Sequence, residues 1–273
     1  MIKVLLILLM ILLVLYLFLV APRTIHRADR TSFMGNPFYA HRGLFDNESD
    51  APENSLAAFQ KAIDAGYGME FDVQLSKDDK LVVFHDATLK RMCGVEGNVW
   101  DYTLEELQRF RLKNSKETIP TLEQVLKLVD GKVPLIVEYK MDRPLTKVCE
   151  LGNELLSRYN GVYCIESFHP FAVMWYKKHR PDVMRGQLSG NLSKQAKNPK
   201  QKKIYTLVTY LLTNVLTRPD FIAYDHRYVN NISRRVCRWL GALSVTYTIK
   251  SVERYEEVKN DFDLFIFDSC RLR

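Results

Sequence analysis

Residues 68–86 read GMEFDVQLSKDDKLVVFHD, and this stretch decides the fold. It contains two apolar segments, 68–75 and 81–84, which are separated by only five residues, SKDDK. A parallel crossover between strands needs a dozen or more residues, so these two segments are expected to form a hairpin. The second segment is therefore predicted to be an antiparallel excursion from a larger sheet.

The rest of the chain alternates apolar segments with helical stretches, a pattern typical of a parallel sheet covered by helices. The other apolar segments lie near residues 37–41, 133–139, 162–168, 183–188, 221–224, 243–248 and 264–267. Helices are expected at 55–65, 104–112, 122–129, 146–159 and 171–179. With the hairpin strand set aside, eight parallel strands remain. The prediction is an α/β fold, a TIM-type (β/α)8 barrel with a small hairpin excursion after strand 2.

Composition agrees with one barrel and excludes some classes of function. A chain of 273 residues, 26% charged and 47% hydrophobic, is large enough for a sizeable core. Its net charge of +7 suits an anionic lipid surface or a phosphate substrate. Nucleic-acid binding is not expected, because no basic stripe is interleaved with stacking aromatic residues. The five cysteines have scattered spacings that match neither a zinc site nor a disulfide framework.

The amino-terminal residues differ from the rest of the chain. Val4–Val20 is an unbroken apolar run, VLLILLMILLVLYLFLV. As a helix it spans about 26 Å, near the lower limit for crossing a bilayer. A cleaved signal peptide is the alternative, but the run lacks the small residues of a cleavage site. We expect 1–21 to be a transmembrane anchor, 22–35 a polar juxtamembrane linker and 36–273 the barrel domain.

Basic residues give two further expectations about the membrane. Arg23, Arg27 and Arg30 follow the apolar run, whereas only Lys3 and the amino terminus precede it. The positive-inside rule then favours a single-pass protein of the cell membrane with a cytoplasmic catalytic domain. Residues 191–203, NLSKQAKNPKQKK, carry five lysines and no acid. Two interpretations stay open for this segment, a solvated loop before an ordinary outer helix or a basic, apolar patch on the membrane surface.

Three carboxylates at predicted strand ends are candidate metal ligands. Glu70 and Asp72 stand two residues apart on one strand and so point to the same face, and Glu138 ends another strand. Carboxylates in a barrel interior usually accompany a cation, and oxygen ligands suit Ca²⁺ or Mg²⁺ rather than zinc. Salt bridges to Lys140 and Arg42 are the alternative explanation.

Two histidines at strand ends are candidate acid–base catalysts, because histidine titrates near working pH. We expect one of His41 and His85 to take a proton from the nucleophile and the other to protonate the leaving alkoxide. Asp86 is expected to orient His85. Arg42 and Lys140 supply positive donors for a phosphate.

Glu53 and Asn54 stand where a helix is expected to begin, after Pro52. Two roles are open for this pair, a cap of that helix or a supporting position behind the site.

Several short motifs, in matching order and spacing, resemble those of the glycerophosphodiester phosphodiesterase family. They are AHRG at 40–43, PENS at 52–55, AF at 58–59, EFDV at 70–73, VVFHD at 82–86, IPTLEQVL at 119–126 and VEYK at 137–140. A looser likeness continues through SF at 167–168, YT at 247–248 and FD at 267–268. The resemblance covers roughly residues 37 to 270 and leaves the apolar run outside.

The resemblance implies a TIM-type barrel that hydrolyses glycerophosphodiesters to glycerol 3-phosphate and an alcohol. It also implies a divalent cation on the three carboxylates, with the two histidines as general acid and base. Tyr247 stands where the family commonly has tryptophan, and His169 where it commonly has an acid, so the preferred alcohol is open. A lysophospholipase D-like enzyme acting on membrane lysophospholipids is one alternative function. A non-catalytic lipid or phosphate binder is another.

Overall fold

The computed structural model describes residues 1–141 and 146–272. Its strands are β1 (Phe38–His41), β2 (Gly68–Leu75), β3 (Leu81–Val83), β4 (Leu135–Tyr139), β5 (Tyr163–Ser167), β6 (Arg185–Ser189), β7 (Phe221–Asp225), β8 (Leu243–Ile249) and β9 (Leu264–Phe267). Its α-helices are α1 (Ile2–Val20), α2 (Thr31–Met34), α3 (Leu56–Asp64), α4 (Lys90–Cys93), α5 (Leu104–Leu107), α6 (Leu122–Val129), α7 (Lys147–Leu156), α8 (Pro170–His179), α9 (Pro199–Thr209), α10 (Asn214–Thr217), α11 (Ile232–Trp239) and α12 (Val252–Val258). Short 3-10 helices are η1 (Val99–Asp101), η2 (Leu192–Gln195) and η3 (His226–Tyr228).

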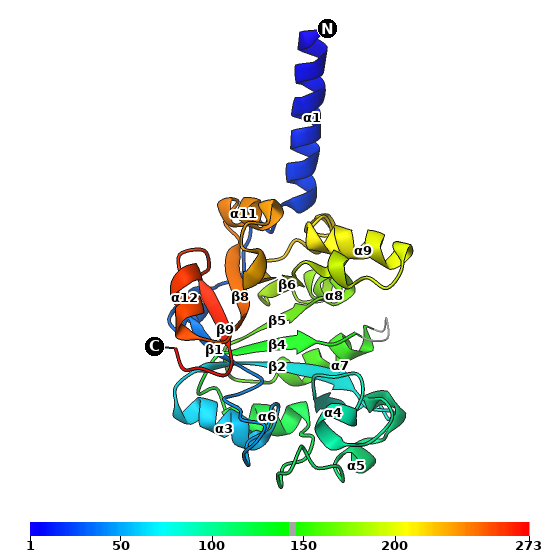
Figure 1. Cartoon of the computed structure of the whole chain (residues 1–273), viewed down its shortest axis with the longest axis vertical. Coiled ribbons are helices and arrows are strands. Elements are labelled where there is room, and N and C mark those ends of the chain that lie inside the picture. Colours follow the sequence, from blue (N-terminus) through cyan, green and yellow to red (C-terminus); the bar gives the residue numbers. More distant parts are fainter. Residues whose placement is uncertain (142–145, 273) are drawn as a thin grey trace.

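The strands form a closed barrel. Their order around the sheet is β1-β9-β8-β7-β6-β5-β4-β2-β3, and a further pairing of β1 with β2 closes the ring. The pairs around this ring are parallel, whereas β3 runs antiparallel to β2 with Leu81 opposite Leu75. Helices surround the strands in Figure 1. The predicted TIM-type barrel with a hairpin excursion after its second strand is confirmed.

Side chains that point into the barrel change from apolar to charged along the strands. In β1, Tyr39 belongs to the buried cluster inside the barrel, and His41 follows two residues later on the same face. In β4, Ile136 belongs to that cluster and Glu138 follows it in the same way. Apolar side chains thus fill the amino-terminal part of the barrel, and charged ones meet at the carboxyl ends of the strands. Active sites of such barrels lie at that end.

The excursion that begins with β3 is larger than a hairpin. After β3 the chain forms α4, η1 and α5 before it returns to the barrel at α6. Side chains of this excursion pack into a small core of their own, which includes Phe84, Met92 and Leu112. This separate core gives the excursion a fixed shape beside the carboxyl end of β2.

One predicted helix is too long. The segment 104–112 is helical only as far as Leu107, where α5 ends. Beyond that point Arg111 forms an antiparallel bridge with Thr118, and Leu112 is buried in the core of the excursion. Because these tertiary contacts need an extended backbone, they end the helix that the local pattern favours.

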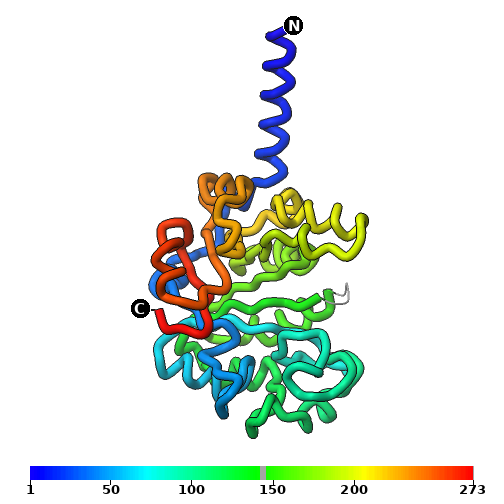
Figure 2. Tube along the Cα trace, viewed as in Figure 1, coloured from blue at the N-terminus to red at the C-terminus, as the bar shows by residue number. Residues whose placement is uncertain are grey.

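Helix α1 stands apart from the barrel. Its most apolar window has a mean hydropathy of 3.1, and none of that window is buried. The helix is long and apolar enough to cross a membrane, a property that a signal sequence shares. Figures 1 and 2 show α1 projecting from the barrel, with the amino terminus at its far end.

The last turn of α1 is bound to the barrel. Val20 is fully buried, and its carbonyl oxygen accepts hydrogen bonds from Asn214 Nδ2 at 2.8 Å and from Cys237 Sγ at 3.2 Å. The Arg218 guanidinium donates to the carbonyl oxygen of Phe18 at 2.9 Å. These contacts fix the place where α1 leaves the barrel, beside α10 and α11.

The segment 22–35 is folded against the amino-terminal end of the barrel. Arg23, Arg27 and Arg30 donate to backbone carbonyl oxygens of the barrel, at 2.7, 2.6 and 3.1 Å respectively. Phe33 is only 3% exposed and belongs to the same buried cluster as the inward-facing apolar side chains. This segment therefore closes one end of the barrel core.

We expect Phe33→Ala to lower the free energy of unfolding by about 3 kcal/mol, because it leaves a cavity at that end of the core. Met34→Ala is the matched control, since Met34 follows Phe33 on α2 and is 47% exposed. Urea unfolding of the full chain in detergent measures both variants. Equal effects of the two substitutions would contradict the packing described for Phe33.

Candidate active site

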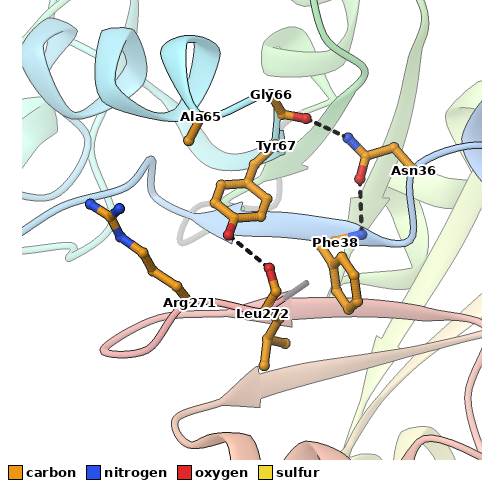
Figure 3. Close-up of a pocket in the computed structure, with 7 residues that line it drawn as sticks. All are labelled: Asn36, Phe38, Ala65, Gly66, Tyr67, Arg271 and Leu272. Atoms are coloured by element: carbon orange, nitrogen blue, oxygen red, sulfur yellow. Dashed lines mark hydrogen bonds between the residues drawn. The ribbon is translucent and has the colours of Figure 1, made fainter.

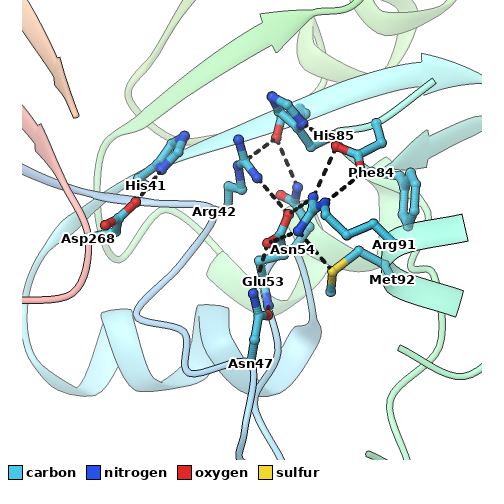
Figure 4. Close-up of polar contacts among 12 residues, drawn as sticks. His41, Arg42, Asn47, Glu53, Asn54, Phe84, His85, Arg91, Met92 and Asp268 are labelled. Carbon is cyan, nitrogen blue, oxygen red and sulfur yellow. Dashed lines mark hydrogen bonds and ion pairs between the residues drawn. The ribbon is translucent and has the colours of Figure 1, made fainter. Parts of the chain in front are cut away.

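His41 ends β1 and points into the carboxyl end of the barrel. Its Nδ1 lies 3.0 Å from Oδ2 of Asp268, and its Nε2 lies 3.9 Å from Oε2 of Glu70. Burial lowers the pKa of His41, and the hydrogen bond with Asp268 opposes that effect. Asp268 follows β9 and holds the imidazole ring in place, as Figure 4 shows.

His85 follows β3 and is held in the same manner. Its Nδ1 lies 2.7 Å from Oδ1 of Asp86, the neighbour expected to orient it. Asp86 in turn accepts hydrogen bonds from Arg91 of α4, one of them from Nε at 2.6 Å. The hydrogen bonds from His85 and Arg91 hold the pKa of Asp86 below its ordinary range, although burial opposes them. In both histidines, Nδ1 thus forms a hydrogen bond with a carboxylate, which leaves each Nε2 available for proton transfer.

The three predicted metal ligands lie together. Oxygen atoms of Glu70, Asp72 and Glu138 all lie within 4.8 Å of one another, and the three side chains are buried. Burial, together with the charges of Asp72 and Glu138, raises the pKa of Glu70 well above its ordinary value. Such a group of buried carboxylates is costly unless positive charge is brought to it.

Salt bridges supply part of the positive charge that these carboxylates require. Lys140 Nζ lies 2.6 Å from Glu138 Oε1 and 2.9 Å from Asp72 Oδ1. Burial lowers the pKa of Lys140, but these two carboxylates outweigh it and raise the pKa overall. Neither carboxyl oxygen of Glu70 has a hydrogen-bond partner among the described residues. Salt bridges thus explain the burial of Asp72 and Glu138 but not that of Glu70. A divalent cation bound by all three carboxylates would explain Glu70 as well.

Glu166 is a fourth buried carboxylate that the sequence analysis missed. It lies on β5 in register with Glu138 on β4 and is 1% exposed. Both glutamates line the cavity that is described below. The Oε2 atom of Glu166 has no hydrogen-bond partner within the described part of the chain, and burial raises its pKa well above the ordinary value. Glu166 could have been found from its position two residues after the apolar Cys164 on a predicted strand. The same spacing separates Ile136 from Glu138.

Backbone conformation places Arg42 at the mouth of the barrel. Arg42 has a φ of 58° and Gly43 a φ of 81°, both in the left-handed region. A Cβ on Gly43 would lie 2.8 Å from the carbonyl carbon of Ala58, so this turn needs glycine. The turned backbone leaves Arg42 Nε 3.6 Å from Asp72 Oδ2 and its NH1 2.6 Å from Glu53 Oε1.

Glu53 and Asn54 face the site rather than cap the helix. Asn54 Nδ2 donates to Asp72 Oδ2 at 2.9 Å. Glu53 accepts hydrogen bonds from Arg91 NH1 and NH2 at 2.7 and 2.6 Å. The cap of α3 is Ser55, whose hydroxyl accepts from the backbone of the first turn. The ion-pair chain in Figure 4 thus runs from Arg42 through Glu53 and Arg91 to the carboxylate beside His85.

These ion pairs around Glu53 make the stability of the fold depend on pH. Burial raises the pKa of Glu53, but the hydrogen bonds from Arg91 and the charge of Arg42 outweigh it and lower the pKa from 4.5 to about 2. Because the folded pKa is lowered, the stabilisation is present above the unfolded pKa and is lost as pH falls toward 2. The loss amounts to about 3 kcal/mol over that window.

We expect the free energy of unfolding to fall less steeply below pH 4.5 in Glu53→Gln than in the parent chain, because glutamine cannot titrate. Urea unfolding of the full chain over a series of pH values from about 7 to about 3 measures the slope. Glu123→Gln is the control, because Glu123 is exposed on α6. An unchanged slope in Glu53→Gln would show that Glu53 is not the group that titrates.

The site residues surround one cavity of about 210 Å³. The charged and histidine side chains that line it are His41, Arg42, Glu70, His85, Glu138, Lys140 and Glu166. Its other wall is made of Phe168, Leu188, Tyr247 and Ile266. The Tyr247 hydroxyl donates to the carbonyl oxygen of Ser189 at 2.6 Å, which fixes the ring at this wall. The cavity therefore has one charged side and one apolar side.

His169, which follows Ser-Phe where the family commonly has an acid, lies at the start of α8. It caps α8 by accepting a hydrogen bond at Nδ1 from the backbone of Phe171 at 3.3 Å. It is not among the residues that line the cavity.

A larger pocket, of about 380 Å³, lies outside the site (Figure 3). Hydrogen bonds across it tie chain segments together. Asn36 donates to the carbonyl oxygen of Gly66 at 2.9 Å, and Tyr67 donates to that of Leu272 at 2.7 Å. Among the described residues, Arg271 is the only one with a charge that lines this pocket, so no cluster of described titratable groups gathers there. The smaller cavity is therefore the candidate active site.

Comparisons with known proteins agree with this geometry. Residues 41–211 match the model of the glycerophosphoryl diester phosphodiesterase family. A glycerophosphodiester phosphodiesterase of Caldanaerobacter subterraneus is 38% identical over 160 residues, which are 55% of this chain and 65% of the relative. A lysophospholipase D of Mus musculus is 32% identical over 151 residues, which are 50% of this chain and 46% of the relative. The match thus spans less than two thirds of each of these relatives.

Solved structures show the same fold. The chain resembles a phosphodiesterase of Oleispira antarctica, solved with sn-glycerol-3-phosphate, with a TM-score of 0.69 at 22% identity. That comparison covers 87% of this chain and 95% of the other. A glycerophosphodiester phosphodiesterase of Parabacteroides distasonis gives a TM-score of 0.66 at 25% identity, covering 86% and 92%. On the extent of the family match, the chain belongs to the glycerophosphoryl diester phosphodiesterase family.

Proposed function

We propose that the protein hydrolyses glycerophosphodiesters to sn-glycerol 3-phosphate and an alcohol. The observation that carries the proposal is the cavity itself, which two histidines line together with two of the three clustered carboxylates, Glu70 and Glu138. Family membership and the 38% identity to a named glycerophosphodiester phosphodiesterase support the same reaction. A non-catalytic binder has no need for two histidines that are each held by a carboxylate.

His41 and His85 are the proposed acid–base pair. One takes a proton at Nε2 from the attacking oxygen, and the other gives a proton to the alcohol oxygen as its bond to phosphorus breaks. The attacking oxygen belongs to water or to the glycerol hydroxyl beside the ester. A cyclic glycerophosphate in rapid-quench samples would identify the hydroxyl, and its absence throughout the first turnover would identify water.

Glu70, Asp72 and Glu138 are the proposed ligands of a divalent cation. The unpartnered oxygens of Glu70 and the excess of buried negative charge fit a hard cation such as Ca²⁺ or Mg²⁺. When bound, such an ion neutralises charge on phosphoryl oxygens. Arg42 and Lys140 line the same cavity and are the proposed phosphate contacts.

Three further residues are proposed to support the site without touching substrate. Glu53 holds Arg42, Asn54 holds Asp72, and Asp86 orients His85. Loss of such support usually costs about 10–100-fold in metal affinity or activity.

Helix α1 is proposed to be a retained membrane anchor rather than a cleaved signal. The buried carbonyl of Val20 accepts hydrogen bonds from two buried side chains, which would lose this acceptor if cleavage near this residue removed it. In the proposed division, residues 1–21 form the anchor, 22–35 the linker and 36–273 the catalytic domain. The arginines after α1 favour a cytoplasmic position for that domain.

A lysophospholipase D-like activity is the second candidate. The exposed apolar α1 and the likeness to a mouse lysophospholipase D favour it. In both reactions the same bond is broken, so only the alcohol and the source of substrate differ.

The full chain in detergent, given glycerophosphocholine or lysophosphatidylcholine in parallel, separates the two candidates. We expect glycerol 3-phosphate from the first and, if the second activity is present, lysophosphatidic acid from the second. Release of choline from neither substrate, by a folded chain supplied with Ca²⁺ or Mg²⁺, would contradict both activities and favour the binder.

A further inference from the structure

Exposed apolar side chains gather on α9 and α11, on the side of the barrel from which α1 projects. Ile204 is 52% exposed and Leu207 is 46% exposed on α9, and on α11 Ile232 is 62% and Trp239 is 77% exposed. Single exposed apolar residues are ordinary on a protein surface, but a group of large ones on neighbouring helices marks an interaction site.

The outward face of α9 combines apolar and basic side chains. Lys200, Lys203, Leu207 and Tyr210 are exposed and recur at the helical spacing, while Val208 on the other face is buried. No acidic residue occurs between Asp182 and Asp220, a stretch that holds all five lysines of the 191–203 segment. Helices that rest on a membrane have this mixture of lysine, aliphatic and aromatic residues.

Helix α11 presents a matching face. Ile232, Arg235 and Trp239 are exposed on one side, and Ser233 and Cys237 are buried on the other. Tryptophan and arginine are both favoured at the level of lipid headgroups, where an apolar body meets a polar layer.

The two helices are joined to each other and to α1. Asn231, the N-cap of α11, donates to the carbonyl oxygen of Thr209, the last residue of α9, at 3.3 Å. Ser233 on α11 forms a hydrogen bond of 2.9 Å with the hydroxyl of Tyr16 in the last turns of α1. In Figure 1 the place where α1 leaves the barrel lies between α9 and α11. A bilayer crossed by α1 would therefore meet both helices.

We propose that the outward faces of α9 and α11 form a membrane-contact surface that lies in the headgroup layer of an anionic bilayer. This proposal rests on α1 as the membrane anchor and is independent of the reaction catalysed. A second copy of the chain is a poorer occupant, because two such basic faces repel each other.

This contact would set the orientation of the barrel. Strands β2, β4 and β5 in Figure 1 run across the direction of α1 rather than along it, so the barrel lies on its side against the bilayer. The basic segment begins beside the cavity, since Tyr247 of the apolar wall donates to Ser189, two residues before Asn191. The mouth of the barrel is then held next to the membrane surface and opens along it.

Trp239 is a natural reporter of the contact. The test uses the full chain with Trp100→Phe and Trp175→Phe, reconstituted in vesicles of phosphatidylcholine and phosphatidylglycerol whose acyl chains are brominated near the carbonyl end. We expect bromine to quench the Trp239 fluorescence about twofold. The matched chain, with Trp175→Phe and Trp239→Phe, keeps only Trp100 in the excursion, and its fluorescence should not change.

Charge variants test the role of the lysines. Lys200→Glu with Lys203→Glu should reduce the quenching of Trp239 in vesicles that contain phosphatidylglycerol, because each lysine near an anionic surface adds to the attraction. Lys127→Glu with Lys132→Glu is the matched control, since both lysines are exposed and lie in or just after α6, on the far side of the barrel in Figure 1. These variants should hydrolyse glycerophosphocholine in detergent as the parent chain does.

Hydrogen exchange of the unmodified chain gives a second measurement that needs no substitution. Residues 200–210 and 232–239 should exchange more slowly in the anionic vesicles than in an uncharged detergent, while exchange in residues 104–110 should not change.

Three outcomes would contradict the proposal. If vesicles retain the protein but Trp239 is quenched no more than Trp100, the membrane-contact surface is overturned and the anchor is left intact. Protection that is already present in detergent and rises with protein concentration would indicate a second copy and overturn it as well. A chain that vesicles do not retain would overturn both surface and anchor.

Discussion

Replacement of either His41 or His85 by asparagine is expected to lower the turnover of glycerophosphocholine by about 10²–10⁴-fold. Asparagine keeps a hydrogen-bonding side chain but cannot carry a proton between oxygens near neutral pH. Each imidazole is fixed at Nδ1 by a carboxylate, so the lost function is proton transfer at Nε2. Glycerol 3-phosphate release by the full chain in detergent, measured at saturating substrate, gives the change in kcat.

His179→Asn is the control, because His179 ends α8 on the outside of the barrel and should leave kcat unchanged. Cation binding, followed as a rise in melting temperature with added Ca²⁺ or Mg²⁺, should persist in both active-site variants. A kcat within about threefold of the parent in either variant would remove that histidine from the mechanism.

Glu70→Gln is expected to have two opposite effects. Activity should fall by at least about 10²-fold, because a neutral amide is a poor ligand for a hard cation. Without added metal, the free energy of unfolding should rise by about 1 kcal/mol, because the substitution removes a buried carboxylate that has no hydrogen-bond partner among the described residues and lies beside Asp72 and Glu138. Urea unfolding with and without Ca²⁺ or Mg²⁺ measures the stability term.

The same unfolding measurements, made with and without the cation, test whether Glu70 is a metal ligand. The parent chain should become more stable as the cation is added, and Glu70→Gln should not, since ligands that bind only the folded state stabilise it. Glu123→Gln, on the exposed face of α6, should behave like the parent. A variant at Glu70 that is destabilised without metal, or that still gains stability from it, would contradict the assigned site.

The barrel was predictable because strand patterns were strong and one loop was short. The five residues between Leu75 and Leu81 allowed only a hairpin, and the observed antiparallel pairing of β2 with β3 confirms it. The remaining strands lie within one or two residues of their predicted positions. The helix expected over 104–112 failed because tertiary packing inside the excursion outweighed local propensity.

The site was predictable where its residues lie on strands that converge on one rim, as His41, Glu70 and Glu138 do. Glu70 was expected at a strand end but is the third residue of β2, which continues past the rim into the hairpin, and its register partner is His41 at the end of β1. Two residues that support this rim from elsewhere, Asp268 and Arg91, were missed. Asp268 contacts His41 across 227 positions of sequence, and Arg91 reaches Glu53 from the excursion, whose path has no periodic signature. Such contacts depend on the closed ring and the packed excursion, so no local pattern of sequence indicates them.

The most direct test of the proposed function is release of sn-glycerol 3-phosphate from glycerophosphocholine by the full chain in detergent. The chain is first stripped of metal with a chelator and then supplied with Ca²⁺ or Mg²⁺. The account predicts no release after stripping and recovery with at least one of the two ions. Undiminished release from the stripped chain, or a folded chain that stays inactive with both ions, would contradict it.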